Sequence, residues 1–330
     1  MIVLLILTIT SLLNSFSCSN PCVTQVTKPV DHAEGPVWDY RTETLYYVDI
    51  HAGGLYSYHP KSNNLQHINL NGSLSVIIPS QSNTTYFFGG LNRTLTLIQW
   101  DGGKGLGKTQ NLAVVQPEYP KSRFNDGKAD KQGRLWFGTM GYENSKGDVD
   151  PNQGALYKFT KNNLQHPDVL IRPVNISNGL AWNKANDKFF YIDTPTNQVR
   201  QYDYDDKSGT ISNPKIVFDV DDHPAITGHP DGMTIDRDDN LWVALYNGGA
   251  VIKVNPRTKK LVEIVPIPAQ FVTSVAWGDT NFTTLYVTTS RYALNKEERI
   301  RQPAAGSVFA VSNTKSSGYP ANFGDIINLP

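Results

Sequence analysis

Cysteine and unbalanced charge are both nearly absent from this 330-residue sequence. Its two cysteines, Cys18 and Cys22, lie close together near the N-terminus, and a small disulfide loop between them stays open as an alternative. The rest of the chain therefore has neither a disulfide nor a thiolate metal site. The formal net charge is zero, which argues against the basic surfaces that bind nucleic acids or membranes. We expect no nucleic-acid partner and no membrane association.

Long apolar runs are also missing after Leu13, so no later stretch is a candidate membrane helix. Ile2–Leu13 is almost wholly apolar but too short to span a bilayer, and the small residues Ser15 and Ser17 follow it. This pattern predicts a signal peptide over residues 1–17, cleaved after Ser17, and hence a secreted protein. No Lys or Arg precedes the run, and a buried strand or a retained anchor is the alternative. Residues 18–30 then form an N-terminal extension.

Amphipathic helical periodicity is absent as well, whereas turn-forming and aromatic residues are frequent. The chain has 26 Gly, 20 Pro, 16 Tyr, 13 Phe and 6 Trp, a composition that favours many short strands joined by turns. A small residue followed by a short apolar run recurs six times, and these small residues are Gly35, Ser75, Gly127, Gly179, Gly232 and Ser274. Their spacing of about 40 to 53 residues lies in the range typical of propellers, solenoids and other arrays.

Each copy continues with the same order of strands and turns. In the first copy, the apolar run Pro36–Trp38 is followed by Leu45–Asp49 and Gly54–Tyr58, which are rich in aromatic residues. Antiparallel four-stranded units of this kind, closed into a ring, form an all-β, six-bladed β-propeller, which we predict over residues 31–330. A β-helix or a pair of β-sandwiches is the alternative. The long inserts at 141–153 and 221–230 favour the propeller, because loops of irregular length fit a propeller face.

An oxygen-bearing side chain directly before the glycine is a further pattern, and Asp126 before Gly127 belongs to a looser copy of it. In three closer copies an oxygen-bearing side chain directly precedes the glycine. These residues are Glu34, Asn178 and Asp231, and blades arranged around an axis would bring them to one point. Three hard oxygen ligands suit a divalent cation such as calcium, magnesium or manganese. Asp-Gly and Asn-Gly are also common turn dipeptides, so any one copy alone is better explained as a turn. The three copies together predict a metal site in the central channel.

Five Asn-X-Ser/Thr sequons agree with the predicted secretion. We predict N-glycosylation at four of them, Asn71, Asn83, Asn92 and Asn281. The fifth begins at Asn175, three residues before the candidate ligand Asn178, and its place so close to the predicted channel makes it the doubtful one.

Seven ordered segments between Asp31 and Val311 match the pattern of a known family. They are Glu34–Asp39, Arg123–Lys128, Gly138–Met140, Gly154–Tyr157, Ile176–Trp182, Pro230–Met233 and Leu241–Ala244. On these segments the chain resembles the senescence-marker-protein/gluconolactonase family. The resemblance covers nearly the whole predicted mature chain, and several motifs in the same order make it specific at the level of the family.

The resemblance implies a six-bladed propeller with one divalent metal ion (calcium, zinc, manganese or magnesium) in the axial channel. It places the metal ligands at Glu34, Asn178 and Asp231, and the substrate contacts at Arg123, Asn125 and Glu143. The implied reaction is the metal-dependent hydrolysis of a small sugar lactone such as gluconolactone. A metal ion there would polarise the ester carbonyl and activate a water molecule, and Asp231 would be the catalytic base that accepts the proton.

Two other functions stay open for the same fold and ligands. The first is a secreted propeller that binds calcium or another ligand without turnover, and the second is a luciferin-regenerating type of enzyme. Arg123, Asn125 and Asp231 together favour catalysis over simple binding. We expect the protein to act as a monomer. Three histidines lie near the predicted mouth and are secondary candidates for a role there, with the last the best placed: His32, His223 and His229.

Overall fold

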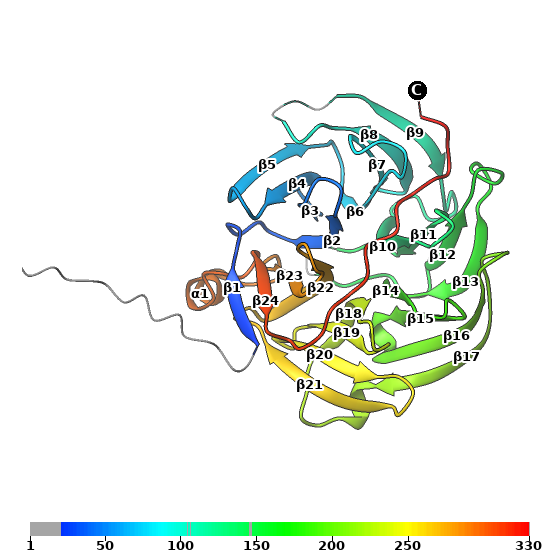
Figure 1. Ribbon diagram of the computed structural model, residues 1–330. Coiled ribbons are helices and arrows are strands. Elements are labelled where there is room, and N and C mark those ends of the chain that lie inside the picture. The colour runs from blue at the N-terminus through cyan, green and yellow to red at the C-terminus, as the bar shows by residue number, and fades with distance from the viewer. Residues whose placement is uncertain (1–20, 104, 106, 145–146, 330) are drawn as a thin grey trace, which may run out of the picture.

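The six sequence repeats form six four-stranded antiparallel sheets that surround a central axis (Figure 1). The computed structural model describes residues 21–103, 105, 107–144 and 147–329, so the predicted signal peptide and Cys18 lie outside the described residues. Each sheet is one blade, and in five of the six blades the four strands follow one another in sequence. This arrangement confirms the predicted all-β, six-bladed propeller.

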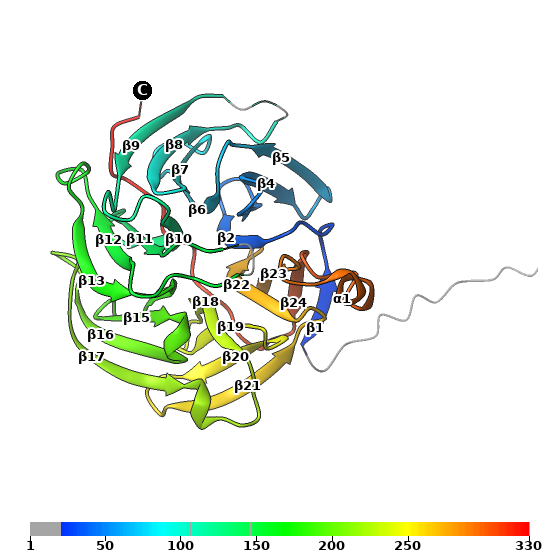
Figure 2. The same ribbon diagram turned by 180° about the vertical axis from the view of Figure 1, so that it is seen from behind.

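The strands of each blade run in order from the axis to the rim (Figures 1 and 2). Blade 1 contains β2 (Ala33–Asp39), β3 (Thr44–Asp49), β4 (Gly54–His59) and β5 (Asn64–Asn69). Blade 2 contains β6 (Leu74–Pro79), β7 (Tyr86–Leu91), β8 (Thr94–Gln99) and β9 (Thr109–Val114). Blade 3 contains β10 (Arg123–Ala129), β11 (Leu135–Met140), β12 (Gly154–Phe159) and β13 (Asp168–Val174).

The remaining blades follow the same plan. Blade 4 contains β14 (Ser177–Trp182), β15 (Lys188–Asp193), β16 (Gln198–Asp205) and β17 (Thr210–Asp219). Blade 5 contains β18 (His229–Ile235), β19 (Leu241–Tyr246), β20 (Ala250–Asn255) and β21 (Lys260–Pro266). Blade 6 contains β22 (Phe271–Gly278), β23 (Thr284–Ser290), β24 (Val308–Ser312) and β1 (Cys22–Gln25).

Blade 6 is closed by the N-terminal end of the described chain. Strand β1 pairs antiparallel with β24, from Cys22 opposite Ser312 to Gln25 opposite Phe309. The predicted boundary at residue 31 is therefore wrong, because part of the 18–30 extension is the outermost strand of a blade. This pairing places a strand that precedes blade 1 in the sequence at the rim of blade 6, so it links the first and last blades of the ring.

Burial along the strands explains why the apolar runs differ between the inner and outer strands. The second strands are buried along their whole length in blades 1 and 3, at β3 and β11, because both of their faces pack against neighbouring blades. The rim strand β21 instead alternates between exposed and partly buried positions. Large aromatic pairs fill the spaces between blades, as where Trp136 meets Trp182 edge-on at 5.3 Å and Trp242 meets Trp277 at 5.4 Å.

Helices are few and short among the described residues. The α-helix α1 (Lys296–Arg301) begins with a capping box between Asn295 and Glu298, and the 3-10 helices η1 (Thr194–Thr196) and η2 (Val220–Asp222) each make a single turn. In the part of the chain that the structure describes, no helix is both long enough and apolar enough to cross a membrane.

The C-terminal segment, residues 313–329, crosses one end of the central channel (Figure 1). Gly318 donates a backbone hydrogen bond to Phe282 in blade 6 at 2.8 Å, and Gly324 donates one to Pro79 in blade 2 at 2.9 Å. Phe323 is buried and stacks on Tyr40 of blade 1 with 5.4 Å between the ring centroids. The segment therefore ties together blades that are not neighbours in sequence, and it covers the end of the channel where the inner strands finish.

Candidate functional site

A β-bulge in each inner strand positions the candidate metal ligands. In blades 1, 4 and 5 the register between the first two strands shifts directly after Glu34, Asn178 and Pro230, respectively. A bulge bends the strand and changes the direction of a side chain, and bulges are frequent beside functional sites. Glu34, Asn178 and Asp231 are all brought into the buried interior in this way, with exposures of 7%, 3% and 6%.

The glycine that follows each ligand serves this bulge. Gly35 has a φ of +53° and Gly179 a φ of +29°, a left-handed region that glycine adopts without the steric cost that other residues meet. A Cβ atom at Gly179 would also lie 2.9 Å from the carbonyl oxygen of Asp231. In these copies the oxygen-bearing residue and the glycine therefore lie in a bulged inner strand, and not in an isolated turn.

The carboxyl groups of Glu34 and Asp231 lie close enough to influence each other strongly. Burial raises the pKa of Glu34 to about 8, with a further contribution from the nearby Asp126 carboxylate. Burial also raises the pKa of Asp231 well above its usual value, and the charges of Glu34 and then Asp126 add to this effect. Acidic groups held together away from water create a site where a bound cation would relieve mutual repulsion.

Asn178 is held by a threonine that the sequence analysis did not single out. The Asn178 Nδ2 donates a hydrogen bond to Thr194 Oγ1 at 2.7 Å, and Thr194 Oγ1 in turn donates to the Pro230 carbonyl at 2.9 Å. These two hydrogen bonds fix the orientation of the Asn178 amide group. They use its Nδ2 as the donor and leave its Oδ1 available to act as an acceptor. Thr194 links blade 4 to the strand that carries Asp231, although as a lone polar residue it has no sequence signal.

The three residues expected to contact substrate form one hydrogen-bonded chain that ends at Asn178. Arg123 Nη2 lies 2.9 Å from Glu143 Oε2, and Arg123 Nη1 donates to Asn125 Oδ1 at 2.7 Å. Asn125 Nδ2 then donates to Asn178 Oδ1 at 3.0 Å. The structure therefore brings Glu143, which the variable loop after β11 carries, into the same site as Arg123 and Asn125.

Asp126 and Lys128 are further buried charged residues of this site that sequence reasoning missed. Asp126 Oδ1 accepts a hydrogen bond from the Gly127 amide at 2.7 Å, whereas Oδ2 has no hydrogen-bond partner among the described residues. Burial raises the pKa of Asp126 and lowers the pKa of Lys128, whose ammonium group donates to the Met233 carbonyl. Their place in the Asn-Asp-Gly-Lys motif on β10 was the available signal, because this motif is a looser copy of the ligand pattern.

The residues present fit a divalent cation. Within the described ranges, no three His, Cys, Asp or Glu side chains gather closely enough to bind a metal ion by themselves. The candidate set therefore needs the Asn178 amide oxygen beside the carboxylates of Glu34 and Asp231. Two negative ligands and one neutral oxygen balance a dication, and carboxylate and amide oxygens are the ligands that calcium, magnesium and manganese prefer.

The two ends of the channel differ in what covers them. Strand β10 runs from Arg123 at one end to Ala129 at the other. Arg123 lines a cavity of about 740 Å³ that His51, Glu143 and Tyr292 also line. At the other end, the Ala129 carbonyl accepts a hydrogen bond from Asn322 of the C-terminal segment at 3.3 Å. A seven-residue strand spans about 23 Å, so the cavity at Arg123 and the C-terminal segment lie at opposite ends.

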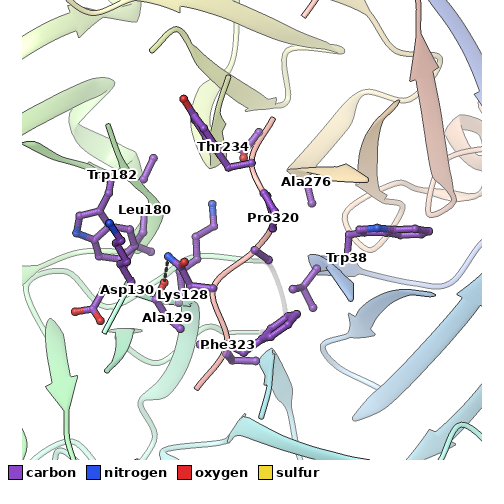
Figure 3. A pocket seen from close by; sticks show the side chains of 18 of the residues that line it. Trp38, Lys128, Ala129, Asp130, Leu180, Trp182, Thr234, Ala276, Pro320 and Phe323 are labelled. Carbon is purple, nitrogen blue, oxygen red and sulfur yellow. Dashed lines mark hydrogen bonds between the residues drawn. The ribbon is translucent and has the colours of Figure 1, made fainter. Parts of the chain in front are cut away.

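A second cavity, also of about 740 Å³, lies at the end covered by the C-terminal segment. Figure 3 shows Pro320 and Phe323 of this segment passing between Trp182 on one side and Trp38 on the other, with Lys128 nearby. Arg123, Asn125 and Glu143 do not line this cavity. Of these two cavities, the one at Arg123 is the cavity lined by expected substrate contacts, namely Arg123 and Glu143.

The three secondary histidines have different surroundings. His32 is buried with Nδ1 3.3 Å from Ser290 Oγ, and burial holds the pKa of its ring well below the usual value. His229 is exposed and its Nδ1 is hydrogen-bonded to Asn197 Oδ1 at 2.6 Å. His223 stacks on Phe218. None of the three is hydrogen-bonded to a candidate ligand in the described structure.

The sequons fall into two groups by exposure. The four asparagines predicted to carry glycans are all exposed: Asn71, Asn83, Asn92 and Asn281. Asn175 is half-buried, and its Nδ2, the atom to which a glycan would be attached, donates a hydrogen bond to Asp193 Oδ2 at 3.0 Å. Glycosylation itself stays a prediction.

Known proteins share both the sequence motifs and this fold. Residues 32–291 match the family model described as the SMP-30/Gluconolactonase/LRE-like region. The chain belongs to this family. Bos taurus regucalcin is 33% identical over 287 residues, which cover 87% of this chain and 92% of regucalcin. A Bacillus subtilis protein provisionally named a sugar lactone lactonase is 34% identical over 301 residues, 89% of this chain and 95% of that protein.

Solved structures of family members agree with the propeller. A luciferin-regenerating enzyme superposes with a TM-score of 0.86 at 32% identity, covering 93% of this chain and all of the other. A regucalcin from Agrobacterium tumefaciens, described as a calcium-binding protein, superposes with a TM-score of 0.79 at 20% identity, covering 92% and 97% of the two chains. At this lower identity the second comparison supports the fold alone.

Proposed function

We propose that the protein is a divalent-metal-dependent lactonase that hydrolyses small sugar lactones such as gluconolactone. One observation carries the proposal most directly. The three expected substrate contacts, Glu143, Arg123 and Asn125, are hydrogen-bonded in series, and the series ends in a 3.0 Å hydrogen bond to Asn178. Groups able to hold a polar substrate therefore lie next to a candidate metal ligand. The family membership supports the proposal, because a relative from Bacillus subtilis is provisionally named for this activity.

The chain's own residues divide the work among themselves. Glu34, Asn178 and Asp231 would hold a divalent cation, which would supply polarisation of the ester carbonyl. Burial, and then the charges of Glu34 and Asp126, raise the pKa of Asp231 well above its usual value, so this carboxylate is suited to take a proton from the attacking water. Arg123 and Asn125 present N–H donors that orient the lactone and stabilise negative charge on its oxygen atoms.

Turnover is tested by an assay of the purified protein on several sugar lactones. Calcium, magnesium, manganese and zinc are each added to protein first stripped by a chelator, and the acid produced is titrated. We expect hydrolysis that disappears on chelation and returns with at least one of the four ions. If the stripped protein binds a cation but no lactone is hydrolysed with any ion, the protein is a binding propeller without turnover.

We also propose that the protein is secreted and glycosylated. The support is the apolar N-terminal run of the sequence together with the exposure of Asn71, Asn83, Asn92 and Asn281 on the propeller surface. Asn92 also lines the cavity beside Arg123, so a glycan at this position would compete with a substrate there.

A further inference from the structure

The cavity beside Arg123 carries more positive than negative side chains. Its charged lining residues are three cations, Arg93, Lys121 and Arg123, and one carboxylate, Glu143. Arg123 and Glu143 form a salt bridge at 2.9 Å, so their charges neutralise each other. Both are already among the expected substrate contacts. The pKa of His51, on the same wall, is lowered by burial and then by Arg123, so its ring adds no charge at neutral pH. The other two cations, Arg93 and Lys121, form no salt bridge with a described residue. The charge of Arg93 does reach Glu118, whose carboxylate pairs with Arg172 at 2.5 Å.

Arg93 is fixed in place by groups that carry no charge. Its Nη1 donates to the carbonyl oxygens of Val115 at 3.0 Å and Gln116 at 3.4 Å, and the side chain is half-buried. Backbone carbonyls hold the guanidinium group but do not neutralise it, and its remaining N–H donors make no salt bridge with any described residue. A guanidinium group that is fixed in place and makes no salt bridge suits an oxyanion with two or three acceptor atoms.

Lys121 stands on the same cavity wall, two residues before Arg123. Its ammonium group lies 4.9 Å from the centre of the Tyr142 ring and, among the described residues, forms no ion pair. The cation–π contact turns the ammonium group toward the loop that also carries Glu143. Lys121 and Arg93 come from different blades, so both reach the cavity only because the propeller places blades 2 and 3 side by side. We call the pair Arg93 and Lys121 the basic mouth.

We propose that the basic mouth selects lactones that carry an anionic substituent, a phosphate or a carboxylate, on a carbon remote from the ester. The inference rests on the proposed lactonase function, because it places the ester at the candidate metal ligands and the anion at Arg93 and Lys121. A neutral sugar lactone would give neither cation an anionic partner. An anionic lactone gains charge-assisted hydrogen bonds and is attracted into the cavity before it binds.

The test compares lactones that differ in one charged group. Glucono-1,5-lactone and 6-phosphoglucono-1,5-lactone form a matched pair, and glucaro-1,4-lactone tests a carboxylate in place of the phosphate. We expect kcat/KM for at least one anionic lactone to exceed that for the neutral lactone by about tenfold. The ratio should fall as salt is added, because salt screens charges at a solvent-accessible mouth.

Variants assign this preference to the two side chains. Arg93→Gln and Lys121→Gln should each lower the anionic-to-neutral ratio of kcat/KM about three- to tenfold, and Arg93→Lys and Lys121→Arg should restore most of it. Lys61→Gln removes the same charge from an exposed pair with Glu43 that lies outside the cavity, and the ratio should not change. Thermal unfolding of each variant shows whether Arg93→Gln, which loses two hydrogen bonds, still folds.

Two results would contradict the basic mouth, and a third result would contradict the proposed lactonase function instead. Equal kcat/KM values for neutral and anionic lactones, or an unchanged ratio in the Arg93→Gln/Lys121→Gln double variant, would contradict the basic mouth. If no lactone is hydrolysed at all, the lactonase function fails. The basic mouth is then tested by calorimetry with the non-reacting acids gluconate and 6-phosphogluconate, and tighter binding of the phosphorylated acid, lost in the double variant, would still support it.

Discussion

Thr194 orients Asn178: the Asn178 Nδ2 donates a 2.7 Å hydrogen bond to Thr194 Oγ1, and both side chains are buried. Thr194 Oγ1 has its own acceptor in the Pro230 carbonyl, one residue before Asp231. A single hydroxyl group therefore connects two of the three candidate metal ligands. Hydrogen bonds of this kind fix the direction of a ligand and commonly change metal affinity when they are removed.

Replacing Thr194 should therefore weaken metal binding without removing a ligand. In Thr194→Val the amide of Asn178 loses its anchor, and we expect the metal Kd to rise about 10- to 100-fold. Thr194→Ser keeps the hydroxyl group and is the matched control, so its Kd should stay near that of the wild type. Calorimetric titration of chelator-stripped protein measures both values. Equal affinity in the valine variant would remove Thr194 from the site.

Metal binding should release protons at neutral pH. In the metal-free protein burial raises the pKa of Glu34 to about 8, and the pKa of Asp231 is raised as well. A cation must displace the protons that these groups hold, so metal affinity should rise with pH up to about 8. Titrations at pH 7 in two buffers with different ionisation enthalpies should give different apparent binding enthalpies. Identical enthalpies would show that no proton is released.

The same shift predicts how the stability of the metal-free protein depends on pH. Folding raises the pKa of Glu34 from 4.5 to about 8, so between these values the folded state holds more protons than the unfolded state. The free energy of unfolding should therefore fall as pH rises through this window. Urea unfolding at pH 5.5 and pH 8 in the presence of a chelator measures the slope. Glu34→Gln, which cannot ionise, should have a flatter profile, and a wild-type stability that rises with pH would contradict the assignment.

The fold could be predicted because it leaves a repeated mark on the sequence, and the same mark singled out the candidate metal ligands, whose role stays a prediction. Every blade has an inner strand with a bulge that contains or adjoins a small residue, and these small residues recur at blade spacing: Gly35, Ser75, Gly127, Gly179, Gly232 and Ser274. The side chain before each glycine is directed to the interior by the same geometry. Repetition made Glu34, Asn178 and Asp231 visible, although each alone would pass for part of a turn.

Other parts of the structure lack such a mark. Thr194 acts through one hydroxyl group after a strand, where a polar residue is common in any case. The four-residue strand β1 has no blade signature of its own and is recruited only through pairing with β24, so the predicted extension at 18–30 missed it. The C-terminal segment 313–329 belongs to no repeat, and Phe323 is buried only because the ring of blades provides a surface for it.

Secretion and glycosylation can be tested together in an animal cell. We expect the protein in the medium, shortened at its N-terminus, with a mass that falls on treatment with an N-glycosidase. Exposure predicts that Asn83→Gln removes one glycan, whereas Asn175→Gln, at a side chain bound to Asp193, leaves the mass of the glycosylated protein unchanged. A full-length, unglycosylated protein found only inside the cell would contradict both proposals.

The central claim is that Asp231 both binds the metal ion and accepts a proton during lactone hydrolysis. Asp231→Asn keeps the shape and one oxygen of this buried side chain but removes its charge and its basicity. The decisive measurement is kcat for a sugar lactone at saturating metal, with occupancy confirmed by titration so that weak binding is not mistaken for lost chemistry. We expect kcat to fall by about a hundredfold or more, the usual effect of losing a general base. A variant that keeps the full wild-type kcat with the metal bound would contradict this account.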